Sequence, residues 1–469
     1  EIEIEKLHGC FTTAVASGSV VPILCCDNKK GIGIEEIVDV ISKYTPSPEK
    51  GLARKSVGME GDEVATEEKD VEVSKNAPFS AQVFKSITDP FVGKLSFFRV
   101  YSGELKHHQE VYNVRAKKNE KIGHMFKTFG KEQQEVDGAI PGDIVTISKI
   151  EDISVSDTLC DPHAKVKFKD IKFPNPMASL AIEPKSSGAE QKISETLHRL
   201  VDEDSTFKVS RDVQTHELVV TGMSNLHLDV ILSRLKSRYG IDVESRQPKI
   251  PHKETITTKA SAQYKHKKQT GGKGQYGEVY LRIEPLERGG GFQFVSKIVG
   301  GAIPSQYIPA VEKGLRETIA KGILSNNPIV DVKVELYDGT FHNVDSSEAA
   351  FKVAASKAFH LAFDDAKPVL LEPVVNIEVT IPSEFMGEIT GNLSSRRGRV
   401  QGMDSFGDLQ VIQASIPMEE VKNYETELKS MTGGRGSYTM ALSHYDVVPS
   451  HLVPLIIAQA KKETEKADK

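Results

Sequence analysis

The segment Gln269–Gly277 has the composition of a loop that could bind phosphate. It spells QTGGKGQYG, and from Gly272 it continues through Glu278 and Val279 as G-x-G-x-x-G-x-V. This pattern is typical of the loop that covers ATP in protein kinases. A kinase also needs H-R-D and D-F-G strings, and neither occurs; Asp404–Gly407 (DSFG) only resembles the second. The chain also lacks a G-x-x-x-x-G-K-[ST] phosphate loop, so a phosphotransferase stays only as the alternative hypothesis.

The surroundings of this loop fit RNA better. Apolar and polar side chains alternate in Ile256–Lys268 and again after the loop, which predicts a connection between two antiparallel strands, whereas a dinucleotide site needs a helix there. From Thr255 to Gly277 there are five lysines, one histidine and no acidic residue. Lysines neutralise phosphates, glycines allow close approach, and a tyrosine can stack on a base. We therefore predict an RNA-contacting tip formed by Lys267, Lys268, Gln269, Gly271, Gly272, Lys273, Gly274, Gln275 and Tyr276.

Two other groups are candidates for RNA contact. His342 follows Asp338-Gly339, a turn signal, and it matters only if this turn lies beside the glycine loop; otherwise it is a solvated histidine. Four arginines form the second group, and arginine suits phosphate geometry, although charges at a helix end also complement its dipole. They are Arg396, Arg397 and Arg399, with Arg435 further along the chain.

The remaining composition excludes several classes of function. No nucleophile–base pair can be assigned, and no histidine or cysteine spacing indicates a metal site, so we predict no catalytic residue and no metal. The four cysteines suggest reduced thiols in a cytoplasmic protein. The chain has 38% hydrophobic residues, 27% charged residues and a net charge of −6, so any RNA-binding surface must be local. No apolar run is long enough for a membrane span.

The length of 469 residues predicts several domains, and the patterns divide the chain into seven parts. In residues 1–45 a short apolar strand at Val20–Cys26 precedes a helix, and residues 46–76 have the charged composition of a linker. Short alternating runs in 77–165 predict a small antiparallel barrel. Residues 172–248 and 374–453 each show the order βαββαβ of a ferredoxin-like domain. Residues 250–372 form another α+β module, in which Asp345 is the predicted N-cap of a helix, and 454–469 form a terminal helix.

Several motifs resemble elongation factor G of the bacterial type. The loop Gln269–Gly277, with GGAIP at 300–304, YIPAVEKG at 307–314 and DSSE at 345–348, is similar to its fourth domain. DPFVGKL at 89–95 resembles the start of its second domain, TGM at 221–223 with LHL at 226–228 its third, and SRRG at 395–398 with Gly434-Arg435 its fifth. The resemblance covers nearly the whole chain in order.

The resemblance implies a fold and a role. The fold would be multidomain α+β: a translation-factor β-barrel, two ferredoxin-like domains, an S5-domain-2-like domain, and at residues 1–45 the end of a P-loop GTPase domain. The family is a ribosome-binding GTPase that moves tRNA and mRNA. Its fourth-domain tip, matching Gln269–Gly277 and the turn with His342, enters the decoding region. The implied partners are ribosomal RNA of both subunits, ribosomal proteins and the tRNA–mRNA complex. The resemblance also implies that the protein is a monomer and does not bind a membrane.

The departures from the family limit these expectations. The chain lacks the family's phosphate loop and switches, so GTP and Mg²⁺ are expected only in an intact member and no GTPase activity is expected here. Cys25-Cys26-Asp27 stands in place of the family's usual guanine-contact motif, and Ser224-Asn225 in place of Gly-Glu. These differences leave open a paralogue specialised for ribosome recycling or protection. The chain is also expected to be a piece of a longer protein.

Overall fold

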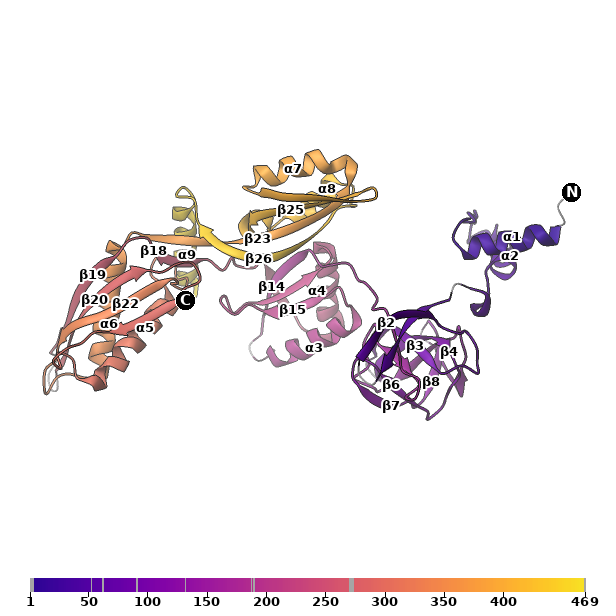
Figure 1. The fold of residues 1–469 in the computed structure, drawn as a ribbon, viewed down its shortest axis with the longest axis horizontal. Helices are drawn as coiled ribbons and strands as arrows, with labels where there is room; N and C mark the ends of the chain where they lie inside the picture. Colours follow the sequence, from indigo (N-terminus) through magenta and orange to yellow (C-terminus); the bar gives the residue numbers. More distant parts are fainter. Residues whose placement is uncertain are drawn as a thin grey trace. The chain divides into compact units, whose positions relative to one another are not determined.

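The computed structural model describes residues 4–51, 53–60, 63–89, 92–130, 132–186, 188, 190–269 and 274–467 (Figure 1). The chain divides into two compact units. Unit 1 contains residues 1–174, 184–209 and 230–242, and unit 2 contains residues 175–183, 210–229 and 243–469. Within the described residues, no helix is both long and apolar enough to cross a lipid bilayer.

Unit 1 begins with two helices, α1 (Ile4–Ala16) and α2 (Ile34–Tyr44). They contact each other through the Phe11 and Tyr44 rings, whose centroids lie 4.7 Å apart. The predicted helix is present, but the strand predicted at Val20–Cys26 is absent. Its backbone has no neighbouring strand to pair with among the described residues, and Ile23 is 89% exposed.

The predicted linker at 46–76 is wrong over much of its length. After a short 3-10 turn, η1 (Pro48–Lys50), the chain forms β1 (Lys55–Glu60) and β2 (Glu63–Asp70). β1 pairs with both β2 and β13 (Val166–Phe168), in a three-stranded sheet. The described side chains of β2 remain exposed, so its backbone is paired while its charges stay in water. A charged composition therefore did not exclude an edge strand.

Residues 80–160 form an antiparallel β-domain around a hydrophobic core. Eight strands lie in the order β7-β6-β12-β3-β4-β11-β8-β9, and β10 pairs with β5. Alternating side chains such as Val83, Phe98 and Ile147 fill the core. The strands are β3 (Ser80–Asp89), β4 (Gly93–Ser102), β5 (Leu105–Lys106), β6 (Glu110–Asn113), β7 (Lys118–Lys121), β8 (Met125–Phe129), β9 (Glu132–Val136), β10 (Gly138–Ala139), β11 (Ile144–Ser148) and β12 (Thr158–Cys160).

The next segment has the element order βαββαβ, as its pattern predicted. Its strands lie in the order β15-β16-β14-β17. The second helix ends at Gly240, whose φ of +65° and amide bond to Lys236 O close the last turn. The elements are β14 (Ala178–Pro184), α3 (Glu190–Glu203), β15 (Lys208–Arg211), β16 (Leu218–Gly222), α4 (Asn225–Tyr239) and β17 (Val243–Arg246).

Unit 2 continues with a sheet that has two helices on one face (Figure 1). The sheet order is β19-β20-β22-β21, and only the last pair is parallel. Val311 and Leu315 of α5 and Phe351 of α6 pack with Val279 and other sheet residues in one core. The elements are β18 (Lys253–Ile256), β19 (Ala260–Lys268), β20 (Gln275–Pro285), β21 (Phe292–Ser296), η2 (Ser305–Tyr307), α5 (Ile308–Lys321), β22 (Val332–Thr340) and α6 (Glu348–Asp365).

A second βαββαβ segment follows. The long strand β23 (Pro368–Pro382) pairs with β18, β25 and β26, and β24 lies beyond β25. The helices α7 and α8 cover one face of this sheet (Figure 1), and their residues Ile389 and Leu428 belong to its hydrophobic core. The other elements are η3 (Ser383–Phe385), α7 (Met386–Ser395), β24 (Arg399–Phe406), β25 (Leu409–Pro417), η4 (Met418–Val421), α8 (Tyr424–Met431), β26 (Ser437–Val447) and the terminal α9 (Val453–Ala467).

Candidate nucleic-acid interface

The glycine loop connects two antiparallel strands, as predicted. β19 and β20 stay in register from Ala260 opposite Ile283 to Lys268 opposite Gln275. Because a strand and not a helix follows the glycines, the hairpin lacks the strand–loop–helix arrangement of a dinucleotide-binding site. The predicted tip residues Gly271, Gly272 and Lys273 lie outside the described residues.

The lysines of the hairpin differ in their partners. Lys259 Nζ lies 3.2 Å from Glu284 and Lys265 Nζ lies 3.6 Å from Glu278, so the base of the hairpin is neutralised. The hydrogen bond to Tyr276 and the charge of Glu278 raise the pKa of Lys265. Lys267 and Lys268 are exposed at the far end and have no carboxylate partner within the described chain. Unpaired positive charge is therefore concentrated at the tip.

Gln275 and Tyr276 are partly engaged inside the protein. Gln275 Oε1 lies 3.0 Å from His266 Nε2. The Tyr276 hydroxyl is 2.7 Å from Thr340 Oγ1, and Lys265 Nζ lies 5.3 Å from the centre of its ring. These contacts order both side chains but leave less of Tyr276 for stacking on a base than the sequence suggested.

The turn that carries His342 lies directly beside the hairpin. Tyr276 N donates to Asp345 O at 2.9 Å, and Ser346 Oγ donates to Tyr276 O at 3.0 Å. The predicted turn at Asp338-Gly339 is wrong, because both residues belong to β22 next to a register shift. A Cβ on Gly339 would lie 2.5 Å from Glu278 O, so glycine is required there by close packing. The chain turns later, at residues 341–346.

Asp345 connects this turn to the glycine loop. Its Oδ1 accepts the backbone N–H of Gly274 at 3.1 Å. The prediction of Asp345 as N-cap is wrong: Ser347 is the N-cap of α6, and its side chain accepts from Ala350 N. Asp345 precedes the N-cap Ser347 by two residues, and its side chain instead binds Gly274, the first described residue after the gap in the loop.

The His342 ring is fixed at one nitrogen and open at the other side. The N–H groups of Val344 and Asp345 approach Nδ1 at 3.3 and 3.2 Å. The Asp345 carboxylate oxygen Oδ2 also lies 3.5 Å from Nδ1, so this nitrogen faces the turn itself. The side chain is 53% exposed, and its ring centre lies 6.1 Å from that of Tyr276 in the hairpin.

The four arginines of the last βαββαβ segment are not equivalent. Arg397 makes bonds of 2.6 and 3.0 Å to Glu372, a carboxylate only 6% exposed, and another of 2.9 Å to Glu420. These bonds raise the Arg397 pKa. Arg396 is 18% exposed and binds Glu427 and the Glu420 carbonyl.

The other two arginines are more accessible. Arg399 is exposed on β24, and Arg435 is 56% exposed, with an ion pair of 2.7 Å to Glu384. The structure thus gives Arg396 and Arg397 a role inside the protein and leaves Arg399 and Arg435 as the better candidates for RNA contact.

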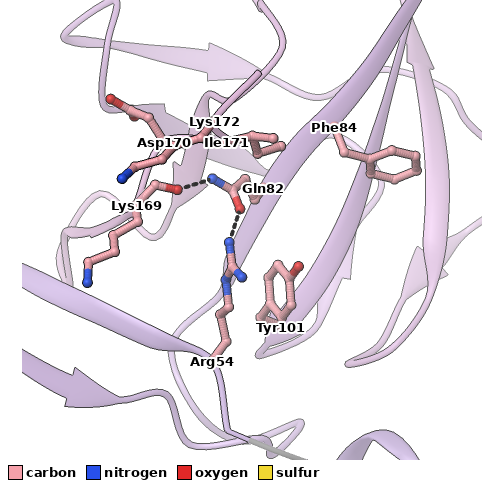
Figure 2. Close-up of a pocket in the computed structure, with 8 residues that line it drawn as sticks. All are labelled: Arg54, Gln82, Phe84, Tyr101, Lys169, Asp170, Ile171 and Lys172. Carbon is pink, nitrogen blue, oxygen red and sulfur yellow. Dashed lines mark hydrogen bonds between the residues drawn. The ribbon is translucent and has the colours of Figure 1, made fainter. Parts of the chain in front are cut away.

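A pocket on the β-domain was not anticipated from the sequence. Figure 2 shows the residues that line it. Its volume is about 810 Å³. Gln82 accepts from Arg54 Nη2 at 2.8 Å, and the Arg54 guanidinium lies 5.6 Å from the Tyr101 ring centre. Part of the pocket wall comes from the segment that was predicted to be a linker, and for this reason the pocket could not be predicted from the sequence. The lining residues are Arg54, Gln82, Phe84, Tyr101, Lys169, Asp170, Ile171 and Lys172.

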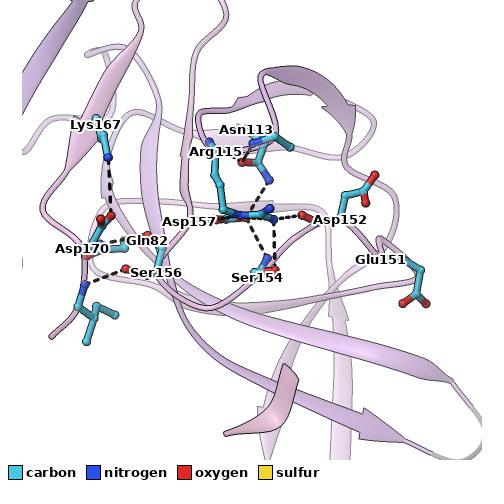
Figure 3. Close-up of polar contacts among 12 residues, drawn as sticks. Gln82, Asn113, Arg115, Glu151, Asp152, Ser154, Ser156, Asp157, Lys167 and Asp170 are labelled. Atoms are coloured by element: carbon cyan, nitrogen blue, oxygen red, sulfur yellow. Dashed lines mark hydrogen bonds and ion pairs between the residues drawn. The ribbon is translucent and has the colours of Figure 1, made fainter. Parts of the chain in front are cut away.

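Hydrogen bonds fix the wall of this pocket to the β-domain (Figure 3). Gln82 Nε2 donates to Lys169 O at 2.8 Å, and Ile171 N donates to Ser156 Oγ at 2.7 Å. Next to Ser156, the buried Asp157 carboxylate accepts from Arg115, which raises the Arg115 pKa. The pocket wall is therefore held on a rigid polar network.

Comparison with known proteins agrees with these features. Four family models match consecutive stretches: elongation factor G domain 2 (residues 78–162), domain III (173–247), domain IV (248–367) and the C-terminus (369–455). An elongation factor G-like protein of Thermotoga maritima is 42% identical over 470 residues, covering 100% of this chain and 68% of the relative. A crystal structure from Thermus thermophilus matches with a TM-score of 0.69 and 35% identity, covering 98% of this chain and 66% of that one.

These matches define the class as a translation factor with a mixed α/β multidomain fold built from elongation factor G domains II to V. The chain belongs to the elongation factor G family. It spans about two thirds of the length of both similar proteins.

Proposed function

We propose that this chain is the ribosome-docking arm of an elongation-factor-G-like protein that acts in the cytoplasm as a monomer. The observation that carries the proposal is the hairpin end: two unpaired lysines stand beside a turn that is bonded to the same loop. Such a tip suits RNA, which is recognised through phosphates and irregular shape. Its contribution would be mechanical positioning, since the described tip contains no nucleophile next to a base.

The finer assignments extend this proposal. Residues 178–246 and 368–447 would be ferredoxin-like domains III and V, residues 253–365 an S5-domain-2-like domain IV, and α1–α2 the end of a GTPase domain. GTP and Mg²⁺ would belong to that GTPase domain. The residues present do not fit them, because the sequence has no phosphate loop. In the intact protein, nucleotide-driven docking of this arm would promote movement of tRNA and mRNA.

The charge at the tip can be tested by the salt dependence of ribosome binding. Replacing Lys267, Lys268 and Lys273 by Ala should weaken binding and reduce the slope of log K against log salt by about 2–3, because each lost phosphate contact lowers it by roughly 1. A matched control removes three exposed lysines of α5 and α6, Lys313, Lys321 and Lys357, with the same change of net charge. Equal slopes for the tip variant and the parent chain would refute the RNA-contacting tip.

The step that the intact protein performs needs a separate measurement. The full protein with its GTPase domain should advance mRNA by one codon per GTP-dependent step on a pre-translocation ribosome, read by the position of the mRNA. Subunit splitting of post-termination ribosomes without any such advance would instead assign it to recycling.

A further inference from the structure

Three potential metal ligands lie close together on the β-domain, although they are well separated in the sequence. One ligand atom from each of His107, His124 and Glu135 lies within 4.8 Å of the other two. His107 is in the turn between β5 and β6, His124 directly precedes β8, and Glu135 is on β9. Spacings of 17 and 11 residues match no metal-binding motif, which explains why the sequence predicted no metal.

Backbone hydrogen bonds hold these three segments together without any metal. His107 N donates to Asp137 O at 3.1 Å, and His108 N donates to Ile122 O at 3.0 Å. In the β8–β9 ladder, Phe126 pairs with Glu135, which places Glu135 near His124. Binding an ion would therefore require side-chain rotation but no rearrangement of the chain.

The His107 ring carries an unexplained feature. Its Nε2 is buried and has no hydrogen-bond partner within the described part of the chain. Buried polar atoms normally have a partner, so one without any points to a missing ligand. His124 Nδ1 contacts Glu135 Oε1, and an ordinary surface ion pair accounts for these two residues. It does not account for His107, whose ring centre is 5.1 Å from that of His124.

We propose that His107, His124 and Glu135 bind one divalent transition-metal ion, with Zn²⁺ the best match. Two imidazoles and one carboxylate suit Zn²⁺, whereas Mg²⁺ and Ca²⁺ prefer oxygen ligands. Metal–ligand bonds of about 2.1 Å would bring tetrahedral ligand atoms to roughly 3.4 Å from one another, a short closure from their present separation. His124 and Glu135 are 63% and 54% exposed, so the ion can enter from water, and water would complete its coordination.

The bound ion would connect three segments of the β-domain and stabilise its folded form. A ligand that binds only the folded state raises the unfolding temperature in proportion to the logarithm of its free concentration. This inference is independent of RNA binding at the tip, because the metal-site residues belong to unit 1 and the tip to unit 2.

The test is a titration of the whole chain with ZnCl₂, followed by calorimetry and thermal unfolding. Thiolates are strong zinc ligands and Cys10, Cys25 and Cys26 are exposed, so all proteins in this test carry Ser at these positions. The expected result is one ion per chain and a higher unfolding temperature. His107→Gln, His124→Gln and Glu135→Gln each remove a direct ligand and should lower the affinity by at least about 100-fold, because loss of an outer-shell partner alone costs roughly 10–100-fold. Co²⁺ should give the absorption of a nitrogen–oxygen site without a thiolate charge-transfer band.

Matched controls distinguish this site from surface binding in general. His163→Gln and Glu132→Gln remove an exposed histidine between β12 and β13 and an exposed glutamate of the same strand as Glu135, and both should bind Zn²⁺ like the parent. His124→Gln changes a mostly exposed side chain, and its circular dichroism without metal will verify that it folds. The proposal is overturned if Zn²⁺ does not bind, or if the three ligand variants bind it as tightly as the controls do.

Discussion

At the scale of single residues, Asp345 determines how the tip is held. Its carboxylate accepts from Gly274 N, and its carbonyl accepts from Tyr276 N. Asp345→Ala removes the bond from Gly274 N and the carboxylate that lies 3.5 Å from His342 Nδ1 but keeps the backbone bond, so it should lower the free energy of unfolding by about 1 kcal/mol. The Gly274 amide should then exchange its hydrogen faster, as NMR can measure. Asp365→Ala, at the other end of α6, should leave that exchange unchanged.

Two neighbouring arginines should separate stability from RNA binding. Arg397→Ala leaves the buried Glu372 carboxylate without its partner, so it should cost about 2–3 kcal/mol of unfolding free energy by denaturant titration. Arg399→Ala changes an exposed side chain and should alter stability by about 0.5 kcal/mol or less. If Arg399 contacts RNA, its variant alone should weaken ribosome binding at unchanged stability. A stable Arg397→Ala protein would contradict the structural role of that arginine.

At the scale of elements, a single carboxylate organises the segment after α5. Glu254 on β18 is fully buried and accepts the N–H groups of Ile323, Leu324, Ser325 and Asn327. Glu254→Ala leaves several buried donors without an acceptor, so we expect a loss of at least about 3 kcal/mol. Glu317→Ala, which breaks an exposed pair with Lys352, should cost about 0.5 kcal/mol or less in the same denaturant titration. Similar losses of unfolding free energy in both variants would contradict this role of Glu254 and its backbone partners, which together we call the Glu254 clamp.

Elements were predictable where local pattern decides their structure. The β19–β20 hairpin followed from alternation alone, and the end of α4 followed from Gly240. The strands β1 and β2 were missed because the charged residues of this segment show no sustained apolar alternation, and the other partner of β1, the strand β13, lies about 110 residues later. The bend at Asp338-Gly339 was misplaced because the glycine there serves close packing inside a strand.

Candidate sites were predictable under the same condition, namely that their residues lie close together in the sequence. The tip could be proposed from the sequence because its lysines lie within one short stretch, whereas the Glu254 clamp and the His107–His124–Glu135 cluster join residues that are distant in sequence. Which arginine is free and which is paired also depends on the fold, because Glu372 and Glu420 come from other elements than Arg397. The sequence supplies the chemical groups, but tertiary pairing decides which of them remain available.

At the scale of the whole molecule, the first helices depend little on the rest. No residue of α2 is buried, and Val38 and Ile41 are 58% and 57% exposed. An apolar helix face of this kind normally packs against another part of a protein. If it belongs to a GTPase domain, as proposed, that domain should cover it in the intact protein.

Deleting residues 1–45 tests this independence, with the cut placed before Pro48, which packs against Gly142. The shortened chain should unfold at the same temperature as the parent, within about 2 °C, because little buried surface is lost. It should also bind less of the dye ANS, since the exposed apolar face of α2 is gone. A lower unfolding temperature would show that the two helices support the β-domain, and unchanged dye binding would place the accessible apolar surface elsewhere in the molecule.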